Sequence, residues 1–363
     1  MPQTMIPKKE LVQEARTVAA ALAQYSTMVV VGIGGSSQGL RAITSALGAR
    51  KKTIIICDDL DPIAFQMATQ HVDWKTTCIN VVSKSGGTLE IMALASVVVD
   101  FLKKAVGEDW IHHVAVTTDP QVGFLRQWAK QHDLKTCQIP ANVGGRFSIF
   151  TAVGLLPLCW AGYDIDALLL GAQSALADAA PKKWAEQQVE WDRSGRSIAV
   201  VMPYSSHLSD YARWFVQLWA ESLGKSEVGQ TPLVAIGTAD QHAQLQMFAE
   251  GAKNKCIRFI IVKSWLQDIV VPESINPETS YLSGKSFGQL LTTAAETTAQ
   301  ALEQVDCPSY TIALPELNET ALGHLMMCDI IMTLAAAKLY GVNPFGQPGV
   351  ELGKKLWRQR IEA

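Results

Sequence analysis

The sequence predicts an α/β protein made of two doubly wound lobes in tandem, each a parallel sheet flanked by helices, followed by a C-terminal helical tail. Its 363 residues, of which 48% are hydrophobic and 18% charged, can bury a core large enough for about two domains. Short β-branched runs alternate with longer amphipathic segments, and this alternation occurs twice. A polar, Ala-rich and charged stretch around residues 178–196 separates the two series.

The order of the segments places the first lobe at residues 1–165, the second at 166–340, and a terminal loop and helix at 341–363. In the first series the strand-like runs are TMVVVGI, TIIIC, CINVVS and HVAVTT, with helical segments from Gln38, over 63–70 and over 88–104. In the second they are SIAVVMPYS, PLVAIG, IRFIIV and YTIAL, with helices ending near Leu223, starting at Asp240, and covering 286–303 and 319–339.

The composition excludes several classes of protein. A net charge of −3 and a pI near 6.2 lack the basic excess that nucleic-acid binding needs. Residues 1–14 are polar, and no apolar run reaches the ~20 residues of a membrane span, so we expect a cytoplasmic protein. The seven scattered cysteines are typical of small buried hydrophobes in a reducing compartment. The sequence contains no CxxC pair, no HExxH motif and no His/Cys/Asp cluster with metal-ligand spacing, so it does not predict a metal site.

The run VVVGIGGSSQG predicts a buried strand that enters a glycine turn and then a helix. Glycines at such a turn let backbone N–H groups approach an anion, so we place Gly35 and Ser36 beside a phosphate or sugar. The alternative is a dinucleotide loop, because Asp58 and Asp59 follow the next strand at the distance of a ribose-binding acid. The third glycine of that fingerprint is replaced by Ser37. This loop alone leaves both ligands open.

The segment SKSGGTLE favours a phosphate. Ser83, Ser85 and Thr88 surround two glycines at a strand-to-helix junction, with Lys84 among them. Three hydroxyls and exposed amides at such a junction suit a phosphate monoester. Thr88 alone is also explained as a helix N-cap, but a cap needs a single hydroxyl.

Six motifs, read together, resemble those of the phosphoglucose isomerases. They are GIGGS, SKSGGTLE, GGRFSIFTAVGLLPL, QLWAESLGK, GTADQHAQLQ and NPFGQPGVELGK, and they extend from about residue 29 to 355. The resemblance implies sugar-isomerase (SIS-type) lobes, with the tail completing an active site. It also implies a glucose-6-phosphate isomerase of glycolysis and gluconeogenesis that needs no metal or organic cofactor.

The resemblance changes how single polar residues are interpreted. Glu221 and Gln217 lie one turn apart on an amphipathic helix, beside its apolar stripe. Without the resemblance, Glu221 is best explained as a solvated glutamate, His242 as a packing or capping histidine, and Lys354 as a solvated lysine. The other histidines, His324 among them, match no motif and are interpreted as structural or exposed.

The resemblance implies the following roles. Glu221 moves a proton between C2 and C1 through a cis-enediol(ate), and Arg146 stabilises the negative oxygen that develops. His242 and Lys354 open the sugar ring. The substrate-binding residues, for phosphate and for sugar hydroxyls, are Ser83, Lys84, Ser85 and Thr88 with Gly35 and Ser36, and Gln217 and Gln347.

In this family the histidine comes from the neighbouring subunit, so a homodimer is implied. The chain departs from the family pattern in three places: a short N-terminal region, Gly346 where Asp is common, and ADQH where NGQH is usual. The alternatives are a dual phosphoglucose/phosphomannose isomerase and a noncatalytic sugar-phosphate sensor of the same fold. A dehydrogenase is the third.

Overall fold

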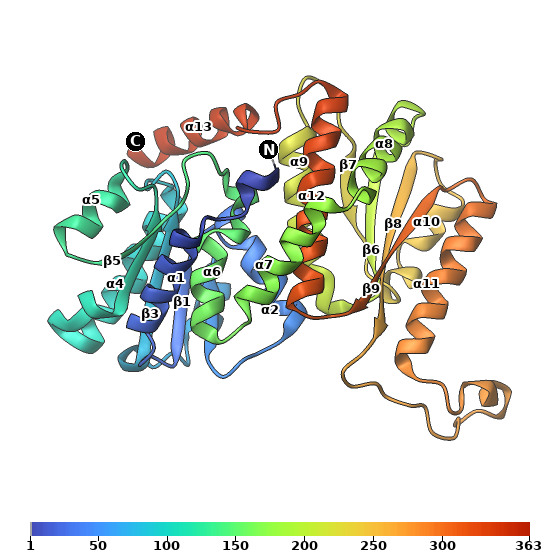
Figure 1. Cartoon of the computed structure of the whole chain (residues 1–363), viewed down its shortest axis with the longest axis horizontal. Helices are drawn as coiled ribbons and strands as arrows, with labels where there is room; N and C mark the ends of the chain where they lie inside the picture. Colours follow the sequence, from blue (N-terminus) through green and yellow to red (C-terminus); the bar gives the residue numbers. More distant parts are fainter. Residues whose placement is uncertain (1) are drawn as a thin grey trace.

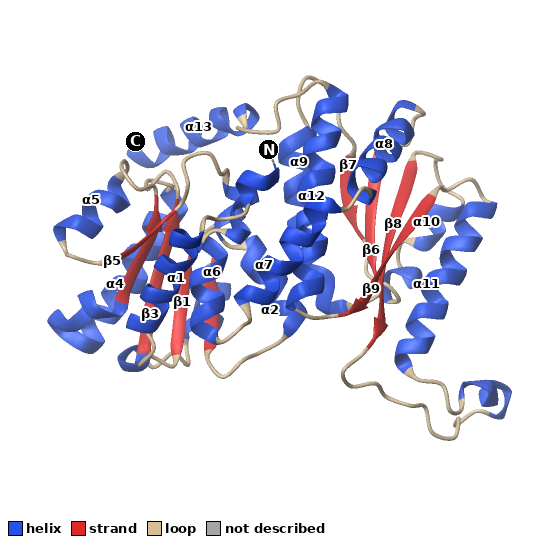
Figure 2. Ribbon diagram, viewed as in Figure 1, coloured by secondary structure: helices blue, strands red, loops and turns tan. Residues whose placement is uncertain are grey.

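The computed structural model describes residues 2–363 and contains two parallel sheets side by side (Figures 1 and 2). The first sheet has the order β2-β1-β3-β4-β5, and all its neighbouring strands are parallel. Its strands are β1 (Thr27–Val31), β2 (Thr53–Cys57), β3 (Thr77–Ser83), β4 (Val114–Thr118) and β5 (Lys135–Gln138). Every residue of β3 is buried, as expected for a central strand with both faces covered.

The second sheet has the order β7-β6-β8-β9, again fully parallel. Its strands are β6 (Ile198–Pro203), β7 (Thr231–Val234), β8 (Lys255–Ser264) and β9 (Ser309–Glu316). Taken in chain order, both sheets have the order 2-1-3-4 in their first four strands, so the two lobes repeat one winding.

Thirteen α-helices occur within residues 2–363. Those that precede or accompany the first sheet are α1 (Lys9–Ala21), α2 (Gln38–Leu47), α3 (Pro62–Thr69), α4 (Leu89–Val106), α5 (Phe124–Gln131), α6 (Ala152–Ala161) and α7 (Ile165–Ser174). The rest are α8 (Ala180–Arg193), α9 (Ser209–Leu223), α10 (Leu245–Ala249), α11 (Phe287–Gln304), α12 (Glu319–Tyr340) and α13 (Glu351–Glu362).

The largest apolar core lies between the two sheets, where α7, α9 and α12 meet α2 (Figure 1). Side chains along β1 alternate between the two faces of the sheet. Met28 and Val30 pack into this shared core, whereas Val29 and Val31 pack into a second core on the other face. Helices α7 and α12 cross closely, since a Cβ on Gly171 or on Gly323 would overlap the backbone of the other helix.

A buried polar network joins β8 of the second sheet to helices α9 and α12, which pack between the two sheets. The Arg258 and Asp329 side chains pair at 2.7 Å with 1% and 0% exposure. Tyr211 on α9 donates to Asp329 and accepts from Arg258, so one network joins β8, α9 and α12. Desolvation raises the pKa of Asp329 and of Tyr211. Breaking such a buried pair is strongly destabilising, and the network therefore holds α9 in place.

Several expectations can be compared directly with these elements. The two doubly wound parallel lobes and the helical tail are confirmed. The sequence pattern missed β5, and the helix expected from Asp240 is a 3₁₀ turn, η8 (Ala239–His242), followed by the short α10. The domain boundaries at 165/166 and 340/341 remain predictions.

The cysteines and the longest apolar helix are both core features. All seven cysteines are free thiols, and six are fully buried. Burial raises their pKa values, to about 12 for Cys78 and Cys256. Within residues 2–363, α12 alone is long and apolar enough to cross a membrane, but 72% of its most apolar window is buried inside the protein. That environment is the one of a core helix.

Candidate active site

The candidate site lies at the carboxyl edge of the first sheet. In an open sheet of order 2-1-3-4-5, the loops after the first and third strands diverge to opposite faces and leave a crevice between them. Here those strands are β1 and β3, and they end in the glycine loop and in the hydroxyl-rich loop, respectively. The topology thus brings both sequence-predicted loops to one crevice.

The hydroxyl-rich loop gathers three side chains. The Ser83 hydroxyl lies 3.5 Å from that of Ser85 and 3.4 Å from that of Thr88, and the last two are 3.3 Å apart. Thr88 occupies the N-cap position of α4, yet its side chain makes no capping hydrogen bond. Its hydroxyl faces the other two, so the capping interpretation is wrong, and three hydroxyls converge beside a helix N-terminus.

Lys84 forms its hydrogen bonds with backbone carbonyls of another segment. Its ammonium donates to the carbonyls of Ala141 at 2.7 Å and Val143 at 2.8 Å. Desolvation lowers its pKa, while the nearby Asp119 opposes that change. Lys84 therefore ties the loop to the segment before Gly144, and direct phosphate contact by its ammonium stays a prediction.

The glycine loop packs against the segment that carries Arg146. A Cβ on Gly35 would overlap the backbone of Gly145 and Arg146, so only glycine allows this approach. A Cβ on Gly34 would lie 3.0 Å from the Gln217 amide nitrogen. Ser36 is half-buried in the short η2 turn (Gly34–Ser36) of the same loop.

An ion pair beside the glycine loop argues against the dinucleotide alternative. Asp58, one of the two acids proposed to bind a ribose, is instead engaged by Arg41 in a two-pronged ion pair with contacts of 2.6 and 2.8 Å, whereas Asp59 has no such partner among residues 2–363. This pairing occupies the carboxylate with a structural partner that links α2 to the end of β2.

Arg146 and Glu221 form the centre of the site. Arg146 Nη1 lies 3.0 Å from Glu221 Oε2, with 5% of the arginine side chain and 30% of the glutamate side chain exposed. Arg146 Nε also donates to Ser222 Oγ at 2.8 Å. Desolvation lowers the pKa of Arg146, and the carboxylate of Glu221 counteracts this. A fixed cation therefore stands beside a partly open carboxylate.

The tail completes this cluster. Arg146 donates to the carbonyls of Pro344 and Gly346 and lies 3.4 Å from the Gln347 side-chain oxygen. Lys225, which the sequence analysis did not single out, donates to the Phe345 carbonyl at 3.0 Å and to that of Asn343. The only sequence signal for Lys225 is its place in QLWAESLGK. These two cations together hold the 343–347 loop over the site.

Gln217 lines the same cluster one turn before the glutamate. Its amide nitrogen donates to Glu221 Oε1 at 3.0 Å. Its oxygen is buried and, among residues 2–363, has no hydrogen-bond partner. A buried acceptor without a partner is costly, and a ligand hydroxyl would satisfy it.

His242 and Lys354 are not brought into this cluster. His242 lies exposed on η8, and its side chain makes no hydrogen bond or ion pair within residues 2–363. Lys354 lies on α13, where it pairs with Glu351 at 2.9 Å and its side chain is 55% exposed. No residue of α13 is buried, although the helix lies across the first lobe (Figure 1).

The topology explains where His242 lies. Helix α9 follows β6 and returns along the sheet, so Glu221 near its end lies where the parallel strand β7 begins. His242 follows the carboxyl end of β7. Within one chain, Glu221 and His242 are therefore at opposite ends of the second sheet.

A comparison with known proteins identifies the family of the chain that carries these loops and this cluster. The family model described as phosphoglucose isomerase matches residues 5–362. The chain belongs to the phosphoglucose isomerase family. A glucose-6-phosphate isomerase of Thermus thermophilus is 40% identical, covering 97% of this chain and 88% of its own.

Two crystal structures agree with this membership. That of a hypothetical protein from Thermus thermophilus has a TM-score of 0.92 and 40% identity, covering 98% of this chain and 88% of the other. That of a glucose-6-phosphate isomerase from Chlamydia trachomatis has a TM-score of 0.86 and 26% identity, covering 98% and 73%. The resemblance drawn from the six motifs is thus confirmed at the level of the phosphoglucose isomerase family.

Proposed function

We propose that the protein is a glucose-6-phosphate isomerase, which interconverts glucose 6-phosphate and fructose 6-phosphate in the glycolysis and gluconeogenesis of the cytoplasm. The observation that carries this proposal is the ion-paired Arg146–Glu221 cluster beside the carboxyl edge that bears the three hydroxyls. A base, a cation and an anion-binding loop are the parts that this reaction needs.

The phosphate is bound at the hydroxyl-rich loop. Ser83, Ser85 and Thr88 donate to its oxygens, and the first turn of α4 adds backbone N–H groups and a favourable dipole. The glycine loop with Gly35 and Ser36 borders the sugar, while Gln217 and Gln347 bind its hydroxyls. The unpaired Gln217 oxygen supports this assignment.

The proton moves on Glu221. In the open-chain aldose, the C2–H bond breaks as Glu221 takes the proton, and the electron pair forms a C1–C2 double bond while O1 becomes negative. Arg146 stabilises this enediolate oxygen, at a site where its charge is poorly screened because the guanidinium is buried. Return of the proton to C1, with transfer of the O2 hydroxyl proton to O1, gives the ketose.

Ring opening requires a separate acid and base, and we assign these roles to His242 and Lys354. Because Glu221 and His242 lie at opposite ends of the second sheet in one chain, the histidine must reach the site from a second copy. A homodimer with shared active sites accounts for this arrangement.

The surface supports association of two copies. The segment 265–287, which leaves the carboxyl end of β8 and projects from the second lobe (Figure 1), carries strongly exposed apolar side chains. They include Leu266, Ile269, Val270, Ile275 and Tyr281, with exposures of 95, 62, 57, 104 and 70%. Apolar side chains gathered in this way mark an interaction surface.

A dual phosphoglucose/phosphomannose isomerase is the second candidate. Gly346 replaces a residue that is commonly Asp in the family, and its carbonyl accepts a hydrogen bond from Arg146 at 3.1 Å. The departure is therefore at the catalytic cluster, where it would relax the choice of sugar. A sensor without activity would need the phosphate loop but not the Arg146–Glu221 pair.

One assay separates these functions. The purified, EDTA-treated protein is given fructose 6-phosphate, and glucose 6-phosphate is measured through a coupled dehydrogenase; mannose 6-phosphate is then tested as substrate. Turnover of the first sugar alone supports the proposal, and comparable turnover of both supports the dual enzyme. Binding of fructose 6-phosphate without turnover would contradict both and support a sensor.

A further inference from the structure

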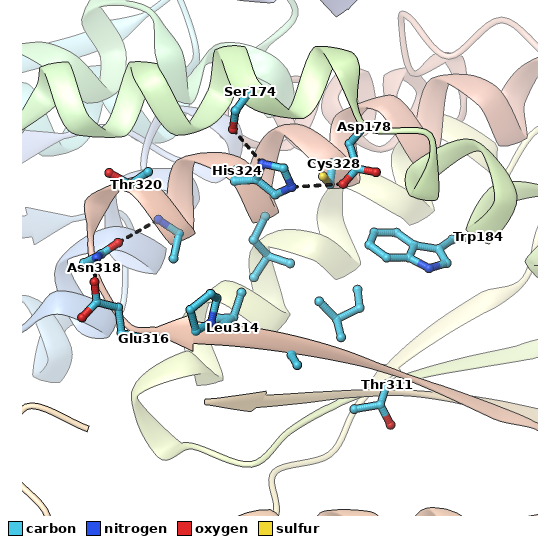
Figure 3. A pocket seen from close by; sticks show the side chains of 15 residues that line it. Ser174, Asp178, Trp184, Thr311, Leu314, Glu316, Asn318, Thr320, His324 and Cys328 are labelled. Carbon is cyan, nitrogen blue, oxygen red and sulfur yellow. Dashed lines mark hydrogen bonds and ion pairs between the residues drawn. The ribbon is translucent and has the colours of Figure 1, made fainter. Parts of the chain in front are cut away.

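A second polar cluster lies away from the catalytic one, in a cavity of about 560 Å³ between the edge strand β9, α12 and the end of α7. The cavity is lined mainly by apolar atoms, among them those of Trp184 and Leu314 (Figure 3). At one end, Ser174, Asp178, His324 and Cys328 converge (Figure 3). None of these four belongs to the elements that carry Glu221 or the phosphate loop.

His324 is hydrogen-bonded through both ring nitrogens. Its Nδ1 lies 2.8 Å from the Ser174 hydroxyl, which also lies 2.7 Å from the Gly171 carbonyl, and its Nε2 lies 3.2 Å from Asp178 Oδ2. When Nδ1 carries the hydrogen and donates to Ser174, Nε2 has a lone pair that faces the carboxylate. A metal ion bound by Nε2 and Oδ2 would then take the place of the proton between them.

A third donor atom completes the set. Cys328 lies one turn after His324 on α12, so its thiol is on the same helix face. The His324 nitrogen, an Asp178 oxygen and the Cys328 sulfur all lie within 4.8 Å of one another. Zn²⁺ bond lengths place tetrahedral ligand atoms roughly 3.5 Å apart, so a small side-chain rotation closes the set.

We propose that Asp178, His324 and Cys328 form a binding site for a zinc-class transition-metal ion. The donor set combines imidazole, carboxylate and thiolate, which is the chemistry that Zn²⁺ selects over Mg²⁺ or Ca²⁺. The Ser174 contact to Nδ1 is the outer hydrogen bond that orients a metal-bound histidine. Three protein ligands leave a fourth position, which faces the cavity and is available to water or a small anionic ligand.

The site joins helices from separate parts of the chain. Asp178 follows α7, whereas His324 and Cys328 lie on α12, 146 residues later in the case of His324. Since the ion binds the folded arrangement only, it stabilises the α7–α12 contact. The proposal is independent of the isomerase reaction, because the catalytic cluster shares no residue with it.

The test is titration of the EDTA-stripped full-length protein with Co²⁺, which reports thiolate ligation by near-ultraviolet charge-transfer absorption. We expect one Co²⁺ per chain, displacement by Zn²⁺, and a rise in the melting temperature with Zn²⁺. Asp178→Asn and His324→Ala are half-exposed positions, and each variant should bind at least about tenfold more weakly. Cys328→Ser should lose the charge-transfer band.

Cys159→Ser, a change at a half-buried thiol outside the cavity, is the matched control and should bind Co²⁺ normally. Turnover of fructose 6-phosphate by Asp178→Asn should equal that of the unchanged protein, which separates this site from the isomerase. Absence of the cobalt band, or a band of equal affinity in Asp178→Asn and His324→Ala, would overturn the proposal. The cluster would then be a His324–Asp178 hydrogen bond without a metal.

Discussion

The Arg146–Glu221 cluster and the His242 and Lys354 side chains differ in what holds them. Arg146 is 5% exposed and is bonded to α9 and to the 343–347 loop, so packing within one chain fixes the cluster. His242 is exposed, and among residues 2–363 Lys354 pairs only with Glu351, on its own helix. One chain thus assembles the residues proposed for proton transfer and leaves apart those proposed for ring opening.

This difference is what we expect if the second group is completed by association, as the proposed homodimer requires. A buried guanidinium with several acceptors is positioned before substrate arrives, which is what electrostatic catalysis requires. An exposed histidine, and an exposed lysine paired with a glutamate of its own helix, are not positioned in this way within one chain.

Glu221→Gln should lower turnover by roughly 10²–10⁴ or more, because the amide cannot accept the proton from C2. Affinity for a nonreacting sugar phosphate should change little, since the hydroxyl-rich loop is intact. Coupled kinetics and calorimetric titration measure the two quantities. Glu186→Gln, on an exposed face of α8, is the matched control. Near-normal turnover in Glu221→Gln would mean that another residue is the base.

Asp329→Ala should reduce the free energy of unfolding by about 3–5 kcal/mol, because it leaves Arg258 as an uncompensated buried charge. Urea denaturation followed by tryptophan fluorescence measures the change. Since Tyr211 on α9 shares this network, the variant should also lose turnover by shifting Glu221. A loss below about 1 kcal/mol, the range of exposed pairs, would show that the network does not hold α9.

Thr88→Ala should raise the KM for fructose 6-phosphate by about 10–100-fold with a much smaller change in kcat, since a hydrogen bond to a charged group contributes about 1.5–3 kcal/mol. Stability should be nearly unchanged, because the Thr88 side chain makes no capping hydrogen bond. Thr297→Ala, at an exposed helical threonine, is the control. A lower melting temperature with unchanged KM would restore the capping role.

Glu351→Ala should change stability by less than about 0.5 kcal/mol, because its pair with Lys354 is exposed on both sides, at 66% and 55%. It is the surface counterpart of the Asp329 variant in the same denaturation assay. A loss of several kcal/mol would indicate that α13 is buried against another chain in solution.

The sequence predicted the fold well where strands are continuous β-branched runs, as in β1 and β3, because burial on both faces demands that composition. It missed β5, whose residues KTCQ lack such a run and are partly exposed. The helix expected from Asp240 begins instead as the 3₁₀ turn η8 and continues as α10 only from Leu245, a break that the sequence pattern does not reveal.

The sequence predicted the parts of the candidate site that lie within one continuous motif. It did not predict contacts between side chains and residues far away in the chain. The hydroxyls of SKSGGTLE converge as expected, but Lys84 turns to carbonyls near residue 141, a contact that no spacing shows. Lys225 and the cavity cluster were missed for the same reason. His324 and Asp178 are 146 residues apart, and only the α7–α12 crossing brings them together.

The most direct test of whether Glu221 and His242 of one site come from different subunits is complementation between Glu221→Gln and His242→Ala. Each variant alone should be nearly inactive. After mixing under conditions that exchange subunits, half of the dimers are mixed, and each contains one site with both intact residues. A shared site predicts recovery of about a quarter of full activity. No recovery, with subunit exchange verified, would contradict a shared site and place both residues in one chain's site.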